Sequence, residues 1–156
     1  MIIREFNPTK GEFEQFMECY RAGFPEGYDR YWMSRTVRIH RDTVFVAEDN
    51  SRIVGVVVGI CSSREAWMTS LAVVRDEKYG FAKTTLRLLR TLGTRFQELG
   101  FKEAFATTGR PSVVQFANSV GATLIGLEKD YYFDDEDRYI FKGSTGSLEN
   151  LGRLIR

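Results

Sequence analysis

Apolar residues recur along the chain at two spacings, one typical of amphipathic helices and the other of strands. The residues at 53–61 form a continuous β-branched run, as expected of a strand with both faces buried. Two further segments each place one apolar face at helical spacing. Their apolar residues are Phe13, Phe16, Met17 and Tyr20 in the first, and Leu88, Leu92, Phe96 and Leu99 in the second.

Turn and cap signals between these segments divide the chain into elements. Thr9 and Glu12 have the spacing of a capping box, which marks the start of the first helix. The pattern predicts, in order, a strand at 1–6, a helix after 9, a helix at 28–38, strands at 43–48, 52–61 and 66–74, a helix at 81–99, a strand at 102–107, a helix from 111 to about 121, and a hairpin of 122–133 and 138–142.

The connections between these elements predict how the strands pair. The three strands between residues 43 and 74 follow one another through short turns and should form an antiparallel meander. A helix at 81–99 joins the last of them to the strand at 102–107, so these two strands should run parallel in a βαβ unit. Residues 143–146 are expected to be a flexible hinge, followed by a weakly helical tail.

Composition narrows the class of protein. The 156 residues predict one domain with a sizeable core, and a net charge of +1 gives no global field for a nucleic acid or an anionic membrane. The longest apolar run is far shorter than the ~20 residues of a membrane helix. Cys19, Cys61 and the single His40 have no metal-ligand spacing, and the cysteines suggest no disulfide framework. A reduced, cytoplasmic protein without a metal is expected.

The segment 71–83 has the form of an anion-binding turn. A predicted strand ends there, a charged loop follows, and Gly80 and Ala82 open the next helix. Free backbone N–H groups and the dipole at a helix N-terminus attract an anion such as a pyrophosphate. Small residues let phosphate oxygens approach these amides. The turn predicts a group-transfer enzyme that holds a phosphorylated cofactor, and the alternative is an ordinary strand-to-helix connection without a ligand.

In this turn and in its order of elements, the chain resembles the GNAT superfamily of acetyl-CoA-dependent N-acetyltransferases over residues 2–142. The motif reads Leu71-Ala72-Val73, a charged loop, and Gly80-x-Ala82, and a late helix ends at Val120-Gly121. The resemblance implies an α/β fold with a mixed, mostly antiparallel twisted sheet of about seven strands, a central parallel βαβ unit and flanking helices. It also implies a catalytic domain at 1–142 and a tail at 143–156 that could form a short docking helix.

The resemblance implies acetyl-CoA as co-substrate, with no metal. The backbone of Leu71, Ala72 and Val73 would run along the pantetheine arm like an added strand. The residues implied in binding the pyrophosphate are Lys78, Tyr79, Gly80, Phe81, Ala82 and Lys83. Glu77 stands where the family has Gln or Arg. At ~6 Å and an effective dielectric of ~20, its repulsion of a phosphate charge would be roughly 3 kcal/mol, so Glu77 should point to solvent or pair with a cation.

The implied mechanism is direct attack of a neutral amine on the thioester, which requires an acceptor for the amine proton and a donor for the carbonyl oxygen. Glu65 lies two residues before Trp67, and so on the same face of a strand, and is the predicted base. The alternative for Glu65 is a solvated surface charge. Trp67, Thr69 and Thr107 are predicted to line the substrate pocket, with Thr108 as a further pocket hydroxyl.

The family's general-acid tyrosine is missing, because Ala117 occupies its place four residues before Gly121. Arg110 likewise stands where the family has an asparagine. Coenzyme A leaves as a thiolate with a pKa of ~8.5 and needs little assistance. Asn118 is the predicted substitute donor, and the alternatives are Ser119, Tyr79 or a water molecule.

Four aromatic residues gather between the first two predicted helices, namely Phe24, Tyr28, Tyr31 and Trp32. In the family this region commonly covers the acceptor, so Tyr28 and Trp32 are predicted to bind an apolar or aromatic acceptor. The alternative is core packing of a short helix, which aromatic residues at this spacing usually indicate.

The leading prediction is an acyltransferase that moves an acetyl group from acetyl-CoA to a primary amine on a small molecule or a protein. The acyl group could also be larger than acetyl. The rival is a catalytically silent protein of the same fold that binds acyl-CoA, a macromolecular partner, or both. Balanced charge argues against a nucleic-acid partner, no membrane association is expected, and the sequence is compatible with a monomer or a homodimer.

Overall fold

The computed structural model describes residues 1–74 and 81–150, with side chains up to residue 147. In chain order the elements are β1 (Ile2–Glu5), α1 (Lys10–Gly23), α2 (Arg30–Ile39), the 3-10 turn η1 (Arg41–Thr43), β2 (Val44–Asp49), β3 (Arg52–Cys61), β4 (Ala66–Val73), α3 (Phe81–Glu98), β5 (Glu103–Thr108), α4 (Pro111–Ser119), β6 (Thr123–Phe133), β7 (Glu136–Ser144) and α5 (Thr145–Asn150). All predicted strands and main helices are present, with ends shifted by one or two residues in most cases.

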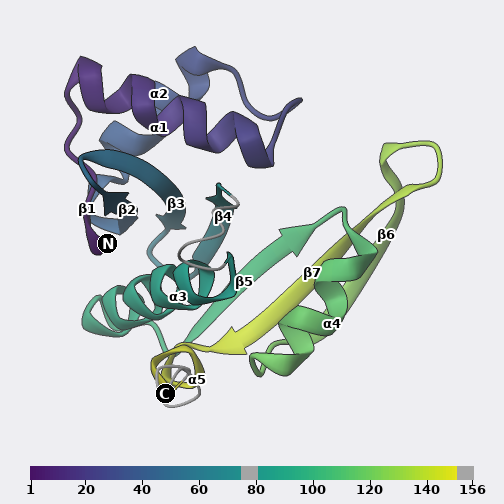
Figure 1. Cartoon of the computed structure of the whole chain (residues 1–156). Helices are drawn as coiled ribbons and strands as arrows, with labels where there is room; N and C mark the ends of the chain where they lie inside the picture. Colours follow the sequence, from purple (N-terminus) through teal and green to yellow (C-terminus); the bar gives the residue numbers. More distant parts are fainter. Residues whose placement is uncertain (75–80, 151–156) are drawn as a thin grey trace.

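The strands form one seven-stranded sheet in the order β1-β2-β3-β4-β5-β7-β6 (Figure 1). β2, β3 and β4 pair antiparallel, which confirms the predicted meander. Among the described strands only β4 and β5 pair in parallel, and α3 connects them. The fold class predicted from the sequence is therefore confirmed.

Helices cover both faces of the sheet (Figure 1). α1 and α2 pack over one face, where Phe16, Met33 and Val56 belong to one buried cluster. α3 packs on the opposite face, where Leu88 and Phe96 join a second cluster with Val57. The continuous β-branched run of β3 supplies residues to both clusters, so it is buried on both sides as its sequence predicted.

The start of each N-terminal helix has its own cap. Thr9 Oγ1 accepts the N–H of Glu12 at 3.3 Å, which confirms one half of the predicted capping box. The other half is wrong, because the Glu12 carboxylate accepts the N–H of Asn7 at 2.8 Å and pairs with Arg4 at 2.7 Å. Asp29 caps α2 by accepting the N–H of Trp32 at 2.8 Å, so this helix begins two residues later than predicted.

α3 lies close against β3 because β3 has glycine where the helix crosses it. A Cβ on Gly59 would lie 2.8 Å from both Leu92 Cδ1 and Phe96 Cζ. Leu88, Leu92 and Phe96 are buried as predicted, but Leu99 is 48% exposed and does not belong to the core. α3 ends at Glu98, and Gly100 then takes a φ of +92°, so Leu99 lies beyond the buried face.

The predicted hinge at 143–146 is wrong, because Gly143 and Ser144 continue β7 and α5 follows directly. Thr145 is buried, its N–H donates to Lys102 O at 3.0 Å, and its hydroxyl donates to Phe101 O at 2.9 Å. α5 packs against α3 (Figure 1). The predicted tail residues Leu151, Leu154 and Ile155 lie outside the described residues.

Candidate functional site

The candidate site lies where β4 and β5 separate. The two strands pair at only two positions, Trp67 with Phe105 and Met68 with Ala106. Beyond them β5 pairs with β7 as far as Thr108, while within the described residues the second edge of β4 has no strand partner. Backbone N–H and C=O groups on such an edge require water, side chains or a ligand. β4 and β5 therefore diverge beyond these two pairs.

A β-bulge lies at this divergence. Val58 pairs with Ser70 and Gly59 with Met68, so Thr69 is an extra residue on β4. Bulges bend a strand and are common beside active sites. Thr69, predicted to line the substrate pocket, thus lies beside the divergence, and its hydroxyl donates to Val58 O at 3.3 Å and so is bonded to β3.

The start of α3 has features that fit a phosphorylated cofactor. Phe81, Ala82 and Lys83 form its first turn and are exposed. The Oγ1 of Thr85, on the second turn, is buried without a hydrogen-bond partner, an arrangement that a bound phosphate or an ordered water would relieve. The predicted Lys78, Tyr79 and Gly80, together with Glu77, lie outside the described residues.

The residues of β4 that would accompany the pantetheine arm are Leu71, Ala72 and Val73. On one side they pair with β3, opposite Val57, Val56 and Gly55. Cys19 Sγ lies 3.9 Å from Ala72 O, and burial raises the pKa of this thiol to about 12, so Cys19 stays neutral. The fit to a CoA thioester thus rests on main-chain groups of β4 and on the first turns of α3.

Glu65 and Trp67 lie on the same face, as predicted. Trp67 Nε1 donates to Glu65 Oε2 at 3.0 Å, and the indole stacks on Phe105 with ring centroids 4.9 Å apart. Glu65 is exposed and precedes β4, whereas the strands separate only after Met68. At ~3.3 Å per residue, Glu65 is roughly 13 Å along the chain from Thr69. It can therefore serve an amine at the divergence only through water.

The predicted hydrogen-bond donors on α4, Asn118 and Ser119, are exposed to solvent. Ala117 is buried. The Ser119 hydroxyl donates to Phe116 O at 2.6 Å and is thus engaged within its own helix. α4 packs on β6 and β7.

The aromatic residues between α1 and α2 do not all pack in the core. Tyr28 and Trp32 stack with ring centroids 3.7 Å apart, and Tyr28 is 49% exposed. Tyr31 is 73% exposed, whereas Phe24 packs against the core. Core packing is therefore the wrong alternative for Tyr28, Tyr31 and Trp32 and the right one for Phe24.

The sequence predicted no role for two residues beside the site, Arg110 and Tyr132. Arg110 Nη2 donates to Gly23 O at 2.6 Å, and a Cβ on Gly23 would lie 2.8 Å from Ala72 Cβ of β4. Arg110 thus links the end of β5 to the helix that lies on β4. Tyr132 of β6 interacts with the hydroxyl of Thr107, the predicted pocket residue near the end of β5. Neither contact has a local sequence signal, because the partners are distant along the chain.

Two kinds of feature are absent from the described parts of the chain. Within residues 1–74 and 81–150, no three His, Cys, Asp or Glu side chains gather in a way that could hold a metal ion. Over the same ranges no helix combines the length and the hydrophobicity that crossing a bilayer requires.

No protein-family model matches the sequence, and no curated protein sequence matches it. Solved structures do match. Ard1 from Thermoplasma volcanium is 20% identical with a TM-score of 0.77, covering 92% of this chain and 96% of that one. Naa20 from Chaetomium thermophilum, in complex with a bisubstrate analogue, is 18% identical with a TM-score of 0.78, covering 98% and 90%. An aminoglycoside 6'-N-acetyltransferase complexed with coenzyme A is 16% identical with a TM-score of 0.76, covering 93% and 97%.

These structural neighbours are N-acetyltransferases of one fold, and each comparison spans at least nine-tenths of both chains. The divergence of β4 from β5 and the sheet order agree with that architecture. The chain therefore has the GNAT fold.

Proposed function

We propose that this protein is an N-acetyltransferase that transfers the acetyl group of acetyl-CoA to a primary amine by direct attack. The observation that carries the proposal is the separation of β4 from β5 beyond Met68 and Ala106, which leaves an edge of β4 without a strand partner among the described residues. Neighbours of the same fold bind coenzyme A or a bisubstrate analogue, which supports the same co-substrate here.

The chain's own groups have separate roles in this proposal. The free edge of β4 at Leu71, Ala72 and Val73 binds the pantetheine arm through main-chain hydrogen bonds. Residues 78–83 bind the pyrophosphate, where the dipole of α3 and Lys83 favour negative charge. A main-chain N–H near the bulge polarises the carbonyl oxygen. When bound, acetyl-CoA supplies the activated acyl group, and Asn118 remains the proposed donor to the departing sulfur.

The binding half of the proposal is tested by calorimetry with acetyl-CoA and with desulfo-CoA. Both share the diphosphate and the pantetheine arm, so both should bind at micromolar concentrations. If neither compound binds, the proposal is rejected. Calorimetry detects binding directly, so this result does not depend on whether the acetyl group is transferred.

Glu65→Gln tests the proposed water-linked base. Glutamine keeps an oxygen for the Trp67 indole N–H, so the local structure should persist while the basic group is lost. Turnover should fall by ~10²–10⁴, the usual contribution of one general base, with the affinity for acetyl-CoA unchanged. The measurement is thiol release against pooled amines, peptides and aminoglycosides across pH. Unchanged turnover and an unchanged pH profile would show that Glu65 is a surface charge.

A second candidate function is acyl-CoA binding without catalysis. It is favoured by Ala117, which is buried where the family places a tyrosine hydroxyl. Tight binding of acetyl-CoA with no thiol release for any pooled acceptor would identify this function.

The acetyltransferase that we propose acts on a small-molecule or protein acceptor. It is a monomer or a homodimer, and it is located in the cytoplasm.

A further inference from the structure

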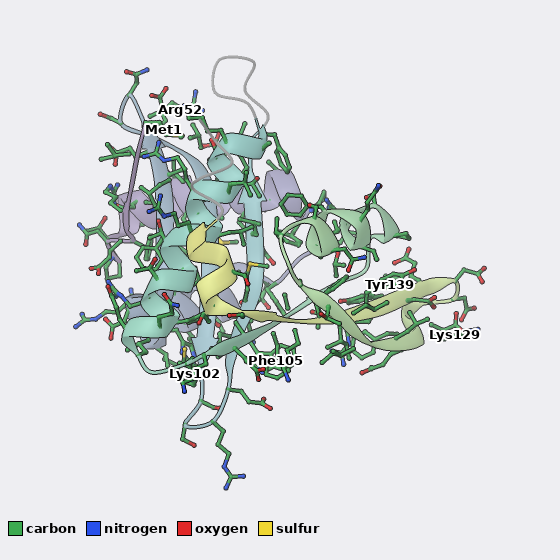
Figure 2. All side chains as sticks on the ribbon, turned by 90° about the horizontal axis from the view of Figure 1, so that it is seen from below. Met1, Arg52, Lys102, Phe105, Lys129 and Tyr139 are labelled. Carbon is green, nitrogen blue, oxygen red and sulfur yellow. The ribbon has the colours of Figure 1, made fainter. Side chains whose placement is uncertain are left out.

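The sheet divides into two parts where β4 and β5 separate. β5, β7 and β6, together with α4, form a part that we call the C-terminal arm. Its hairpin projects to one side of the molecule, where Figure 2 labels Lys129 and Tyr139. Among the described residues, β4 joins the C-terminal arm through two backbone pairs, the second of which is Met68 with Ala106. Beyond this pair, the separation of the two strands depends on contacts other than the sheet ladder.

Arg110 makes such a contact. It follows β5 as the N-cap residue of α4, and its main-chain N–H donates to Thr108 Oγ1 at 3.1 Å, which holds it to the end of β5. Its side chain reaches α1. Nη2 donates to Gly23 O at 2.6 Å, and the guanidinium lies 5.9 Å from the centroid of the Phe24 ring. Arg110 therefore links the C-terminal arm to the end of α1.

The end of α1 that Arg110 contacts lies directly on β4. A Cβ on Gly23 would lie 2.8 Å from Ala72 Cβ, and Cys19 Sγ, one turn earlier in α1, lies 3.9 Å from Ala72 O. A continuous set of contacts thus runs from the end of β5 through Arg110 and Gly23 to Ala72. In the proposed function, Ala72 lies in the segment of β4 that binds the pantetheine arm.

Arginine is a poor choice for the position that Arg110 occupies in its helix. Ser, Thr, Asp and Asn stabilise an N-cap by accepting an N–H of the first turn, and the Arg110 side chain makes no capping bond. A cation at a helix N-terminus is also unfavourable to the helix dipole. Both effects lower the stability of α4, so the benefit of this side chain must come from its contact with α1.

We propose that Arg110 is a positioning residue for acetyl-CoA, because it links the end of β5 to α1 on β4 and so holds the two strands at the separation that the pantetheine arm requires. The inference rests on the proposed acetyltransferase function. Arg110 acts here through α1 and not by touching the cofactor. A separation that is fixed before the cofactor arrives lowers the ordering cost of binding. Loss of the link should therefore weaken acetyl-CoA binding without loosening the fold.

Arg110→Ser separates positioning from stability. Serine is a favoured N-cap, so the free energy of unfolding in urea should equal or exceed that of the unmodified protein. The affinity for acetyl-CoA, measured by calorimetry, should nevertheless fall roughly three- to tenfold, the range for one hydrogen bond. Arg110→Lys keeps the charge and a donor for Gly23 O, so it should recover most of the affinity. Arg64→Ser, the same replacement at an exposed position between β3 and β4, should leave the affinity unchanged.

Gly23→Ala tests whether Arg110 acts through α1. The added Cβ would push the end of α1 away from Ala72, so this variant should also bind acetyl-CoA more weakly. Adding Arg110→Ser to Gly23→Ala should then cause little further loss, because the link is already broken. Additive losses would overturn the inference, since Arg110 would then act on the cofactor by its charge or by direct contact.

Two further results would overturn the inference. One is an acetyl-CoA affinity of Arg110→Ser equal to that of the unmodified protein. The other is a lower free energy of unfolding of Arg110→Ser alongside the weaker binding, which would mean that the arginine only stabilises the fold. Failure of the unmodified protein to bind acetyl-CoA would instead overturn the proposed function, and the same calorimetry identifies that outcome before any variant is compared.

Discussion

Ala82→Glu is expected to weaken acetyl-CoA binding by about a hundredfold. Ala82 is exposed in the first turn of α3, where the proposed pyrophosphate site lies. A carboxylate at ~6 Å from a phosphate charge is repelled by roughly 3 kcal/mol at an effective dielectric of ~20, which corresponds to about two orders of magnitude in affinity. Fold stability should not fall, because a negative charge in the first turn of a helix is favourable to its dipole. Calorimetry gives the affinity.

Arg90→Gln is the matched control for that variant. It also makes the net charge more negative by one unit, on an exposed position of the same helix two turns further on. Its acetyl-CoA affinity should stay close to that of the unmodified protein. If Ala82→Glu and the unmodified protein bind acetyl-CoA with equal affinity, the start of α3 is not the cofactor site.

Phe96→Ala is expected to lower the free energy of unfolding by about 3–5 kcal/mol, the range for a large aromatic residue removed from a core. Phe96 is buried, its ring packs over the glycine at position 59 of β3, and it meets Phe101 edge-on at 6.5 Å. The glycine leaves no side chain that could fill the vacated space. Urea unfolding measures the change, which is a large part of the stability of a domain of this size.

Leu99→Ala provides the control for the core variant. The two positions are three residues apart and were predicted to lie on the same apolar stripe, but Leu99 is exposed beyond the end of α3. Its replacement should change the free energy of unfolding by no more than about 0.5 kcal/mol. A loss comparable to that of Phe96→Ala would mean that the stripe continues past the end of α3.

Much of the fold could be read from local patterns. The spacing of Phe13, Phe16 and Tyr20 predicted α1, and the β-branched run of β3 predicted a strand buried on both faces, because burial of a regular element imposes its own period on the sequence. The failures are at ends and junctions. Residues 143–146 look flexible by composition, yet the hydrogen bonds of Thr145 to residues distant in sequence hold this segment in place.

The candidate site likewise has features that the sequence predicted and features that it did not. Thr69 and Thr107, which the sequence predicts to line the pocket, each lie one residue beyond the last β4–β5 pair, Met68 with Ala106. The exposure of Tyr28 and Trp32 could not be predicted, since an aromatic residue at helical spacing can face either way. Tyr132 was predicted only as part of a strand, and nothing in the order of residues shows that it interacts with Thr107.

By itself, then, the sequence determined the order of elements, the parallel β4–α3–β5 unit and the small residues at the start of α3. These features are local, and they follow from hydrophobic period, turn chemistry and the shape of glycine and alanine. Only the tertiary structure decided how far β4 and β5 stay paired, that Glu65 stands away from their divergence, and that Arg110 bonds to the end of α1. Such contacts depend on strand twist and on bulges. Twist accumulates from strand to strand across the sheet, and neither feature produces a hydrophobic pattern within a single segment of the sequence.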